Sequence, residues 1–570
     1  MRIIQRPLVN SSPMQLAGWS SVLAVTAVGP PLPKSGVQGD QRRREMGASR
    51  CTGTPSLGNP KLPHLEPHPT WLHDRADAPA LPTGCRQQSV SKSANGAGAV
   101  LLQPHITSIP SISHLAPPRP LIALAQNNHI SSIATAKMPV DPKLHVDESI
   151  PWSEPAWLRG VHSPYYTSTH RELQRAVRQY VDTHLLPSAL EWEEKGDVPP
   201  EEAERFCKSG IPFVDIPEPY RPADIPNIGG IPRAELDAFH FLIMSDEMSR
   251  VEGGVGIALA GASSIGAPPI VNCGTEEQKR KWLPGLFTRK TNFSLGITEP
   301  SGGSDVARIK TTAEKTPDGK FYIVNGVKKW ITGTPWATHM TTAVRTGRPG
   351  MKGVSLLVIP MDSPGIMHQK IQNSGQNAGG ASFVYLENVR VPVENLLGEE
   401  NEGFMIIMKN FNKERFLLTV GCNRKARSCL AMSFQYAMKR ETFGKPLIEN
   451  QVIRRKLSEM AHRIEAHWAW LEQLAYHIKC SDLGWEDPQI ASRVALLKVQ
   501  GGQLIELAAR EAAQIFGGAG YMKGGPGAAV EQINRDLRML VVGGGSEEII
   551  ADLAVRLELA MMGGLGGAKL

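Results

Sequence analysis

Glu414 is the carboxylate whose surroundings in the sequence could serve acid–base chemistry. It lies between Lys413 and Arg415 in the segment FNKERF, inside a long stretch with helical periodicity. A glutamate between two cations on a helix is usually a solvated surface charge. The same carboxylate would act as a general base if a closed apolar site removed it from water, because desolvation raises the pKa of a carboxyl group toward the working pH.

Several other chemical patterns are absent from the sequence. H-E-x-x-H and C-x-x-C spacings do not occur and the seven cysteines are scattered, so we expect free thiols and no metal. No G-x-G-x-x-G segment opens a βαβ unit, which argues against a Rossmann nucleotide site. No run of 18 apolar residues occurs, so no membrane span is expected.

The net charge of +7 does not indicate a nucleic-acid partner. Residues 1–137 contain 13 Lys or Arg and 5 Asp or Glu, whereas the rest of the chain contains 49 and 50. The basic excess therefore lies in the first segment, and the body of the chain is nearly neutral. Residues 1–137 are also rich in Pro, Ser, Gly and His without a sustained period. We expect a disordered leader there, which is either a targeting segment or a gene-model artefact with Met138 as the true start.

Three regions after the leader must position any functional residues. Residues 150–290 carry apolar side chains at a 3.6-residue period and a capping-box pattern, which predict an α-helical domain. Short β-rich segments separated by Gly, Pro and Asn follow at 291–398 and indicate an antiparallel β-barrel domain. Long amphipathic stretches at 399–563 indicate a four-helix bundle, and 564–570 is a Gly-rich tail expected to be flexible. The predicted fold class is α+β with several domains.

Four segments of the chain resemble the acyl-CoA dehydrogenase family and occur in the family's order. They are GITEPSGGSD (296–305), KKWITG (328–333), KRETFGKPLIENQVIRRKLSEMA (439–461) and QIFGGAGY (514–521). The resemblance covers about residues 155–563. It implies FAD as cofactor and an acyl-CoA thioester as substrate. It also implies α,β-dehydrogenation to the trans-2-enoyl-CoA, in which a base removes the α-proton and flavin N5 accepts the β-hydride. Arg308, where the family usually has a small residue, and a longer Gly-Pro-Gly stretch after 522 depart from the family pattern.

The position of the base follows from a comparison of two sites in the family. Many members carry the catalytic glutamate shortly after an Arg-Asp pair, and that position is Gly544 here. A smaller subset, including isovaleryl- and long-chain-type enzymes, carries it on the first bundle helix directly before an arginine, and that position is Glu414. A carboxylate missing at one site and present at the other favours Glu414 as the base. The backbone N–H of Gly544 remains an expected donor to the thioester oxygen.

The resemblance also assigns binding residues. Substrate-binding positions are Ser304, Asn412, Arg415, Gly544 and Gly545. Cofactor-binding positions are Thr298, Ser304, Trp330, Thr332, Arg440, Thr442, Gln451, Gln514, Gly517, Gly518, Ser546 and Glu548. Because Gln514, Gly517 and Gly518 resemble a segment that meets the FAD of a neighbouring subunit, we expect a homodimer or homotetramer. For Trp330 the alternative is a core aromatic of the β domain.

Three questions stay open from the sequence. The electron acceptor is either an electron-transfer flavoprotein or O₂, as in an acyl-CoA oxidase. A non-catalytic or nucleic-acid-associated flavoprotein of the same fold is a further alternative, disfavoured by Glu414 and by the near-neutral body. The final residues Ala568-Lys569-Leu570 look like a relaxed S-K-L address and predict a peroxisomal location, with the mitochondrion as alternative because the leader is poor in acidic residues.

Overall fold

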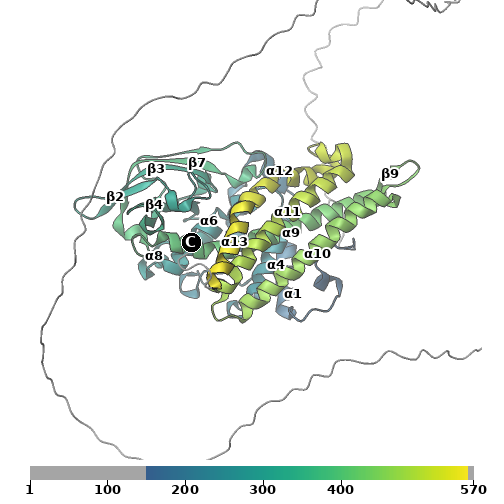
Figure 1. Cartoon of the computed structure of the whole chain (residues 1–570), viewed down its shortest axis with the longest axis horizontal. Coiled ribbons are helices and arrows are strands. Elements are labelled where there is room, and N and C mark those ends of the chain that lie inside the picture. Colours follow the sequence, from purple (N-terminus) through teal and green to yellow (C-terminus); the bar gives the residue numbers. More distant parts are fainter. Residues whose placement is uncertain (1–148, 563–570) are drawn as a thin grey trace, which may run out of the picture. The chain divides into compact units, whose positions relative to one another are not determined.

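The computed structural model describes residues 149–562 of the chain (Figure 1). The expectations for the leader at 1–137 and for the tail at 564–570, with its terminal Ala568-Lys569-Leu570, lie outside these residues. The described part follows the expected order of a helical region, a β sheet and long helices. No helix in it combines the length and apolar character needed to cross a membrane.

The first region is made of short helices around a buried apolar stripe. Leu173 and Val177 on α1 and Val181 and Leu185 in the following turn are fully buried, as their spacing predicts. The capping box at Thr275 is present at the start of α8, where the threonine accepts from the N–H of Gln278. The helices are α1 (Ser168–Tyr180), α2 (Ala189–Lys195), α3 (Pro200–Lys208), α4 (Ala238–Met248), α5 (Val255–Ala260), α6 (Ser263–Gly266), α7 (Pro268–Cys273) and α8 (Glu276–Trp282).

The middle region is an eight-stranded sheet with the order β6-β7-β3-β2-β4-β5-β8, and β1 pairs with β4. Most neighbours are antiparallel, as expected, but β1 and β2 run parallel to β4. Alternate residues of β3 face a buried core, among them Tyr322 and Val324. The strands are β1 (Phe293–Gly296), β2 (Thr312–Lys315), β3 (Phe321–Ile331), β4 (His339–Arg345), β5 (Val354–Pro360), β6 (Ile366–Lys370), β7 (Ser382–Pro392) and β8 (Leu396–Leu397).

The last region is a bundle of long helices that lie side by side (Figure 1). They are α9 (Gly403–Lys439), α10 (Gln451–Cys480), α11 (Pro488–Phe516), α12 (Ala528–Val542) and α13 (Glu547–Met561), with a small hairpin of β9 (Glu441–Thr442) and β10 (Lys445–Pro446) after α9. Helix α11 contacts all four other helices, and α4 of the first region packs against α9 and α10. The helix α12 is additional to the predicted elements.

Candidate active site

One carboxylate oxygen of Glu414 is held inside the protein without a hydrogen-bond partner among residues 149–562. Glu414 lies on α9, and its Oε2 atom is buried with no hydrogen-bond partner among the described residues. Burial raises the pKa of Glu414 to about 7, although the neighbouring Arg415 opposes this shift. A buried, unsatisfied acceptor is unfavourable for folding, and together with the raised pKa it makes Glu414 a candidate for a chemical role. Glu414 is therefore not the solvated surface charge that its neighbours in the sequence would suggest.

Arg415 connects this part of α9 to the glycine-rich loop at 543–545. The Arg415 side chain is buried, and its Nε donates a hydrogen bond of 2.8 Å to the carbonyl oxygen of Gly544. The loop thus lies beside the helix turn that carries Glu414, although 129 residues separate Arg415 from Gly544. The Gly544 N–H has no acceptor within residues 149–562, which makes it a candidate donor to a ligand. The structure brings the two alternative base positions together.

Lys498 holds the same loop from α11, and sequence reasoning missed it. Its side chain is buried, and Nζ donates to the carbonyl oxygens of Val541 and, at 3.0 Å, of Gly545. Burial lowers the pKa of Lys498. A lysine inside the apolar run VALLKVQGG was the available signal. Next to the loop, Ser546 is partly buried as the N-cap of α13, whereas Glu548 is exposed in its first turn.

The turn GITEPSGGSD is fixed by a buried ion pair. Glu299 accepts from Lys328 Nζ at 2.9 Å, from the Thr311 hydroxyl at 2.6 Å and from two backbone N–H groups. Burial lowers the pKa of Lys328 to about 8, whereas Glu299 acts against this shift. The ion pair joins the turn to β3, so it holds the predicted cofactor residues in place. Among these, Thr298 is partly buried and Ser304 is exposed.

Trp330 is a surface aromatic and not part of the β-domain core. Half of its side chain is exposed, and its backbone φ of 64° is in the left-handed region, which is rare for a bulky residue. The N–H of the preceding Lys329 bonds to the carbonyl oxygen of Thr298 at 2.9 Å, so the turn lies beside Trp330. Thr332, partly buried, lies in the turn directly after β3. An exposed indole held in a strained conformation next to a hydroxyl-rich turn suits a planar ring ligand.

A second group of predicted cofactor residues lies at the far end of the bundle. Arg440 is exposed directly after α9, Thr442 is in the hairpin, and Gln451 begins α10. At 1.5 Å per residue, the 26 residues from Glu414 to Arg440 span about 39 Å of helix. These three residues therefore lie at the opposite end of α9 from the turn that carries Glu414.

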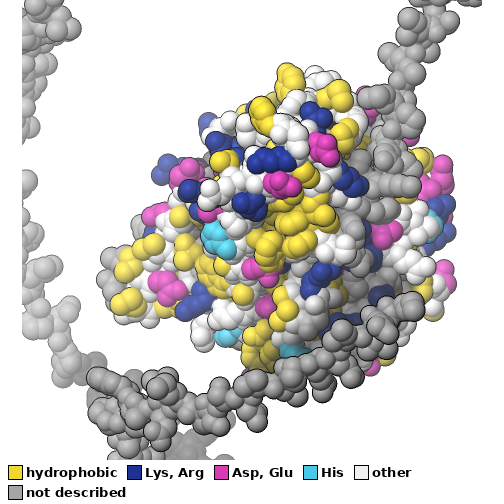
Figure 2. All heavy atoms as spheres, turned by 90° about the vertical axis from the view of Figure 1, so that its right-hand side faces the viewer, with side chains coloured by type: hydrophobic (Ala, Val, Ile, Leu, Met, Phe, Trp, Pro, Cys, Tyr) yellow, Lys and Arg dark blue, Asp and Glu magenta, His cyan; other side chains and the backbone are white. Residues whose placement is uncertain are grey.

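Gln514, Gly517 and Gly518 belong to the same far end. Tyr436 near the end of α9 stacks on Phe516 at the end of α11, with ring centroids 4.3 Å apart. A Cβ atom added at Gly517 or Gly518 would meet no heavy atom within 4 Å, so this backbone faces open space. Exposed hydrophobic side chains occur here too, including Phe443 at 100% and Tyr521 at 90%. Figure 2 shows this end of the molecule, with hydrophobic side chains gathered in the middle of the face.

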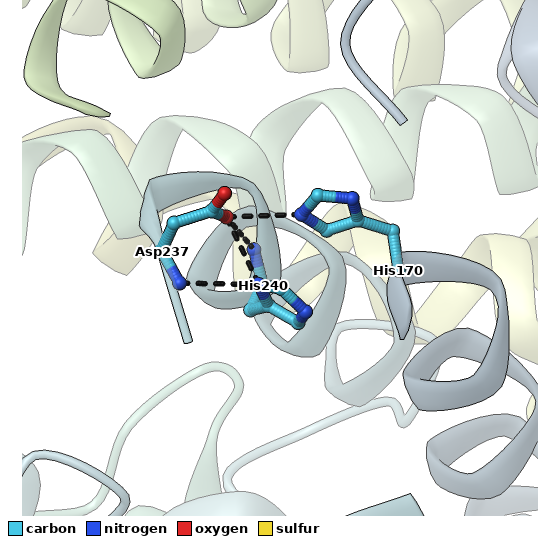
Figure 3. A group of neighbouring side chains, drawn as sticks. All are labelled: His170, Asp237 and His240. Atoms are coloured by element: carbon cyan, nitrogen blue, oxygen red, sulfur yellow. Dashed lines mark hydrogen bonds and ion pairs between the residues drawn. The ribbon is translucent and has the colours of Figure 1, made fainter. Parts of the chain in front are cut away.

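His170, Asp237 and His240 form a cluster of side chains that could hold a metal ion (Figure 3). Each histidine is the third residue of a helix and accepts from the N–H of its N-cap, Thr167 or Asp237. Asp237 also lies 2.8 Å from the ammonium of Lys479. Burial alone would raise the pKa of Asp237, but hydrogen bonds from His170 and Lys479 hold it well below its usual range. These contacts identify the cluster as two linked helix caps, and the absence of a metal remains a prediction.

Comparison with known proteins decides the family. The patterns of the N-terminal, middle and C-terminal domains of acyl-CoA dehydrogenases match residues 167–290, 294–389 and 401–557. The chain belongs to the acyl-CoA dehydrogenase family. It is 42% identical over 416 residues to the acyl-CoA dehydrogenase apdG of Emericella nidulans, which covers 72% of this chain and 95% of that protein. It is 41% identical over 414 residues to the acyl-CoA dehydrogenase AFT10-1 of Alternaria alternata, with 71% and 95% covered.

Solved structures agree with this membership. An acyl-CoA dehydrogenase from Geobacillus kaustophilus has a TM-score of 0.62 at 29% identity and covers 69% of this chain and 99% of its own. An acyl-CoA dehydrogenase from Bacillus anthracis complexed with FAD has a TM-score of 0.62 at 28% identity, with 72% and 70% covered. A chain in the structure of the electron transferring flavoprotein of Acidaminococcus fermentans has a TM-score of 0.62 at 25% identity, with 70% of this chain and 100% of that chain covered.

The described residues fit the FAD that this family uses. The exposed Trp330 and the adjoining turn provide a ring surface and hydroxyl groups, and the far end provides the cation of Arg440 and open glycine backbone. The chain is therefore an FAD-dependent oxidoreductase acting on acyl-CoA-like substrates. The isovaleryl- and long-chain-type subset remains a hypothesis that rests on Glu414. Asn412, the remaining predicted substrate residue, is partly buried on α9 two residues before Glu414.

Proposed function

We propose that the chain catalyses α,β-dehydrogenation of an acyl-CoA thioester to the trans-2-enoyl-CoA, with Glu414 as the base that removes the α-proton. The observation that supports this most is the buried Oε2 of Glu414, which has no partner in the described structure. A pKa raised to about 7 by burial suits a base that must take up a proton near neutral pH. The chemistry that FAD supplies when bound is acceptance of the hydride from the β-carbon.

The rest of the site would make the α-proton acidic. The Gly544 N–H would donate to the thioester oxygen, on which negative charge develops as the proton leaves. Arg415 would hold that loop next to α9 and so fix the donor relative to the base. Because Arg415 Nε is already bonded to Gly544, we propose this positioning role in addition to substrate contact. Ser304, Asn412 and Gly545 remain proposed substrate contacts.

The cofactor site would be shared between subunits. Thr298, Trp330, Thr332, Ser546 and Glu548 would contact the flavin half. The residues at the far end of the bundle would hold the ADP half of an FAD bound to a neighbouring subunit, because about 39 Å of α9 separates them from Glu414. Exposed Phe443 and Tyr521 at that end support a subunit contact there. A homo-oligomer, as dimer or tetramer, follows from this arrangement.

An electron-transfer flavoprotein is the proposed electron acceptor, and O₂ is the alternative. The resemblance to acyl-CoA dehydrogenases supports the flavoprotein. Turnover that reduces an electron-transfer flavoprotein under nitrogen, without peroxide release in air, would support it. Stoichiometric peroxide release in air would favour the oxidase. The peroxisomal location also remains a proposal from the last three residues, and a fluorescent fusion with and without Ala568-Lys569-Leu570 would test it.

The Glu414→Gln variant tests the proposed function. The amide keeps the size of the side chain but cannot take up the proton, so turnover should fall by about 10² to 10⁴-fold. FAD binding, measured by the visible flavin spectrum, should be unchanged. Substrates should first be screened by anaerobic flavin bleaching with butanoyl-, octanoyl- and hexadecanoyl-CoA.

The matched control for this experiment is Glu402→Gln. Glu402 is the exposed N-cap of the same helix α9, so its substitution changes the charge of the helix without touching the buried site. Turnover of this variant should equal that of the wild type. A loss of turnover smaller than tenfold in Glu414→Gln would contradict the role of Glu414 as the base.

A further inference from the structure

We infer that Lys498 is a positioning residue for the reaction, because its ammonium fixes the loop whose Gly544 N–H binds the thioester oxygen. This inference rests on the proposed function above and deepens it. Lys498 does not touch substrate or base in the proposed arrangement. It would act through the backbone of residues 541–545.

The ammonium of Lys498 donates its hydrogen bonds to backbone carbonyl groups. Only 2% of the residue is exposed, and Nζ donates to Val541 O at the end of α12 and to Gly545 O at 3.0 Å. Burying an ammonium is unfavourable unless its protons are bonded. The carbonyl end of a helix is the place where a cation is favoured, so the position of Lys498 at the end of α12 compensates part of that penalty.

Lys498 differs in this respect from the other buried lysines. Lys425 bonds to the Glu252 carboxylate as well as to Val251 O, and Lys328 is paired with Glu299. Lys498 forms no ion pair with any described residue; the ionisable groups around it are Cys422, Arg415 and Glu547. Its ammonium therefore bonds to neutral peptide groups, one at the end of α12 and one in the loop that follows.

The loop needs such support because of its composition. Residues 543–545 are all glycine, with φ of 71° at Gly544 and 118° at Gly545, and glycine segments sample many backbone conformations. Their own backbone hydrogen bonds are Gly543 N–H to Met539 O and Gly545 N–H to Val542 O. Arg415 from α9 and Lys498 from α11 hold the adjacent carbonyls of Gly544 and Gly545. Together they fix the two peptide groups that follow the Gly544 N–H, and Lys498 also holds Val541 on the preceding side, so the peptide group that presents this N–H lies between fixed neighbours.

The experiment compares three variants of the full, FAD-loaded chain: Lys498→Met, Lys498→Arg and the control Lys425→Met. Hydrogen–deuterium exchange is measured for peptides covering 541–546 without ligand. The carbonyl stretching band of a bound trans-2-enoyl-CoA labelled with ¹³C at C1 is measured by infrared difference spectroscopy. The acyl length is the one that bleaches the flavin fastest. Steady-state kcat and KM complete the comparison.

Lys498→Met should lower kcat at least tenfold with KM changed less than threefold. It should speed exchange at 543–546 and move the carbonyl band toward that of the free thioester, since the hydrogen bond that polarises the carbonyl is lost. Lys498→Arg should recover part of each effect. Lys425→Met should lower thermal stability and leave the band and the exchange at 543–546 as in the wild type.

A wild-type carbonyl band and wild-type exchange in Lys498→Met would overturn the inference, whatever happens to kcat. If Lys498→Met fails to fold, the same comparison is made with Lys498→Arg and Lys498→Gln. The role of Glu414 as the base can fail independently of this inference. If Glu414→Gln kept full activity, the carbonyl band of the Lys498 variants would still show whether Lys498 positions the loop.

Discussion

Arg415 Nε lies 2.8 Å from the carbonyl oxygen of Gly544, so the residue after the proposed base is bonded to the alternative base position. This contact places the turn of α9 that carries the proposed base beside the loop before α13. Both positions border the same region of the protein. The backbone N–H at 544 stays in place when the side chain there is only a hydrogen atom.

The rate of substrate oxidation should rise with pH through neutrality. Burial raises the pKa of Glu414 to about 7, and the base must be ionised to accept a proton. Below the pKa, kcat/KM should fall about tenfold per pH unit, and above it kcat/KM should be level. Stopped-flow flavin bleaching under nitrogen from pH 5.5 to 9 measures this profile. A level profile over that range, or an inflection near the ordinary glutamate value, would contradict the role of burial.

A buried ion network should hold the segment before α1 against the bundle. Glu154 Oε2 bonds to Arg178 of α1 at 2.8 Å and to Arg424 of α9 at 3.1 Å. Removing one partner of a buried network leaves uncompensated charge. We expect Glu154→Gln to lower the free energy of unfolding by about 3 kcal/mol. Urea unfolding at pH 7 measures this, with Glu204→Gln, whose exposed pair with Lys208 should contribute nothing measurable, as control.

The Glu154 effect should depend on pH in a defined direction. Burial alone would raise the pKa of Glu154, but Arg424 and Arg178 lower it from 4.5 to about 2. A carboxyl group with a lowered folded-state pKa stabilises the fold fully above its unfolded pKa and loses that effect as the pH falls. The stability difference between wild type and Glu154→Gln should therefore be constant above about pH 5 and shrink between pH 4.5 and 2. A difference that grows on acidification would contradict the network.

Secondary-structure elements could be predicted from the sequence where their signal lies in residues close together in the chain. The 3.6-residue stripe of α1, the capping box at Thr275 and the alternation in β3 each follow from residues a few positions apart. Glu414 became a candidate because the resemblance placed it next to an arginine on the first long helix. Its burial, however, depends on the folded surroundings, and the residues beside it in the sequence predicted exposure.

The contacts that hold the site together could not be predicted because they are distant in sequence. Lys498 and Gly545 are 47 positions apart, and Arg415 and Gly544 are 129 apart. Helix α12 was not predicted because the glycines and proline just before it indicate a loop. The left-handed conformation of Trp330 is also invisible in the sequence, since only the packing around a bulky residue can maintain it.

Moving the carboxylate from 414 to 544 should restore part of the activity. A Cβ atom at Gly544 would lie 3.3 Å from Arg415 Cγ and 3.2 Å from Leu418 Cδ1, so a side chain there begins beside the turn that carries Glu414. We expect Glu414→Gly/Gly544→Glu to be about tenfold more active than Glu414→Gly alone, since a positioned base contributes ~10² or more. It should stay well below the wild type, because φ of 71° strains any non-glycine residue and the two contacts are tight.

The control for the swap is Glu414→Gly/Gly544→Ala, which carries the same backbone strain without a carboxylate. It should show no recovery, and its stability loss should match that of the swapped variant. Gly524→Ala measures the loss of stability that a side chain at positive φ causes without any steric contact, since Gly524 has φ of 92° and no heavy atom within 4 Å of an added Cβ. Anaerobic flavin bleaching and thermal unfolding measure all four proteins. Equal recovery in both double variants would show that loop strain changes the rate, and no recovery in either would show that a carboxylate at 544 does not reach the space that Glu414 serves.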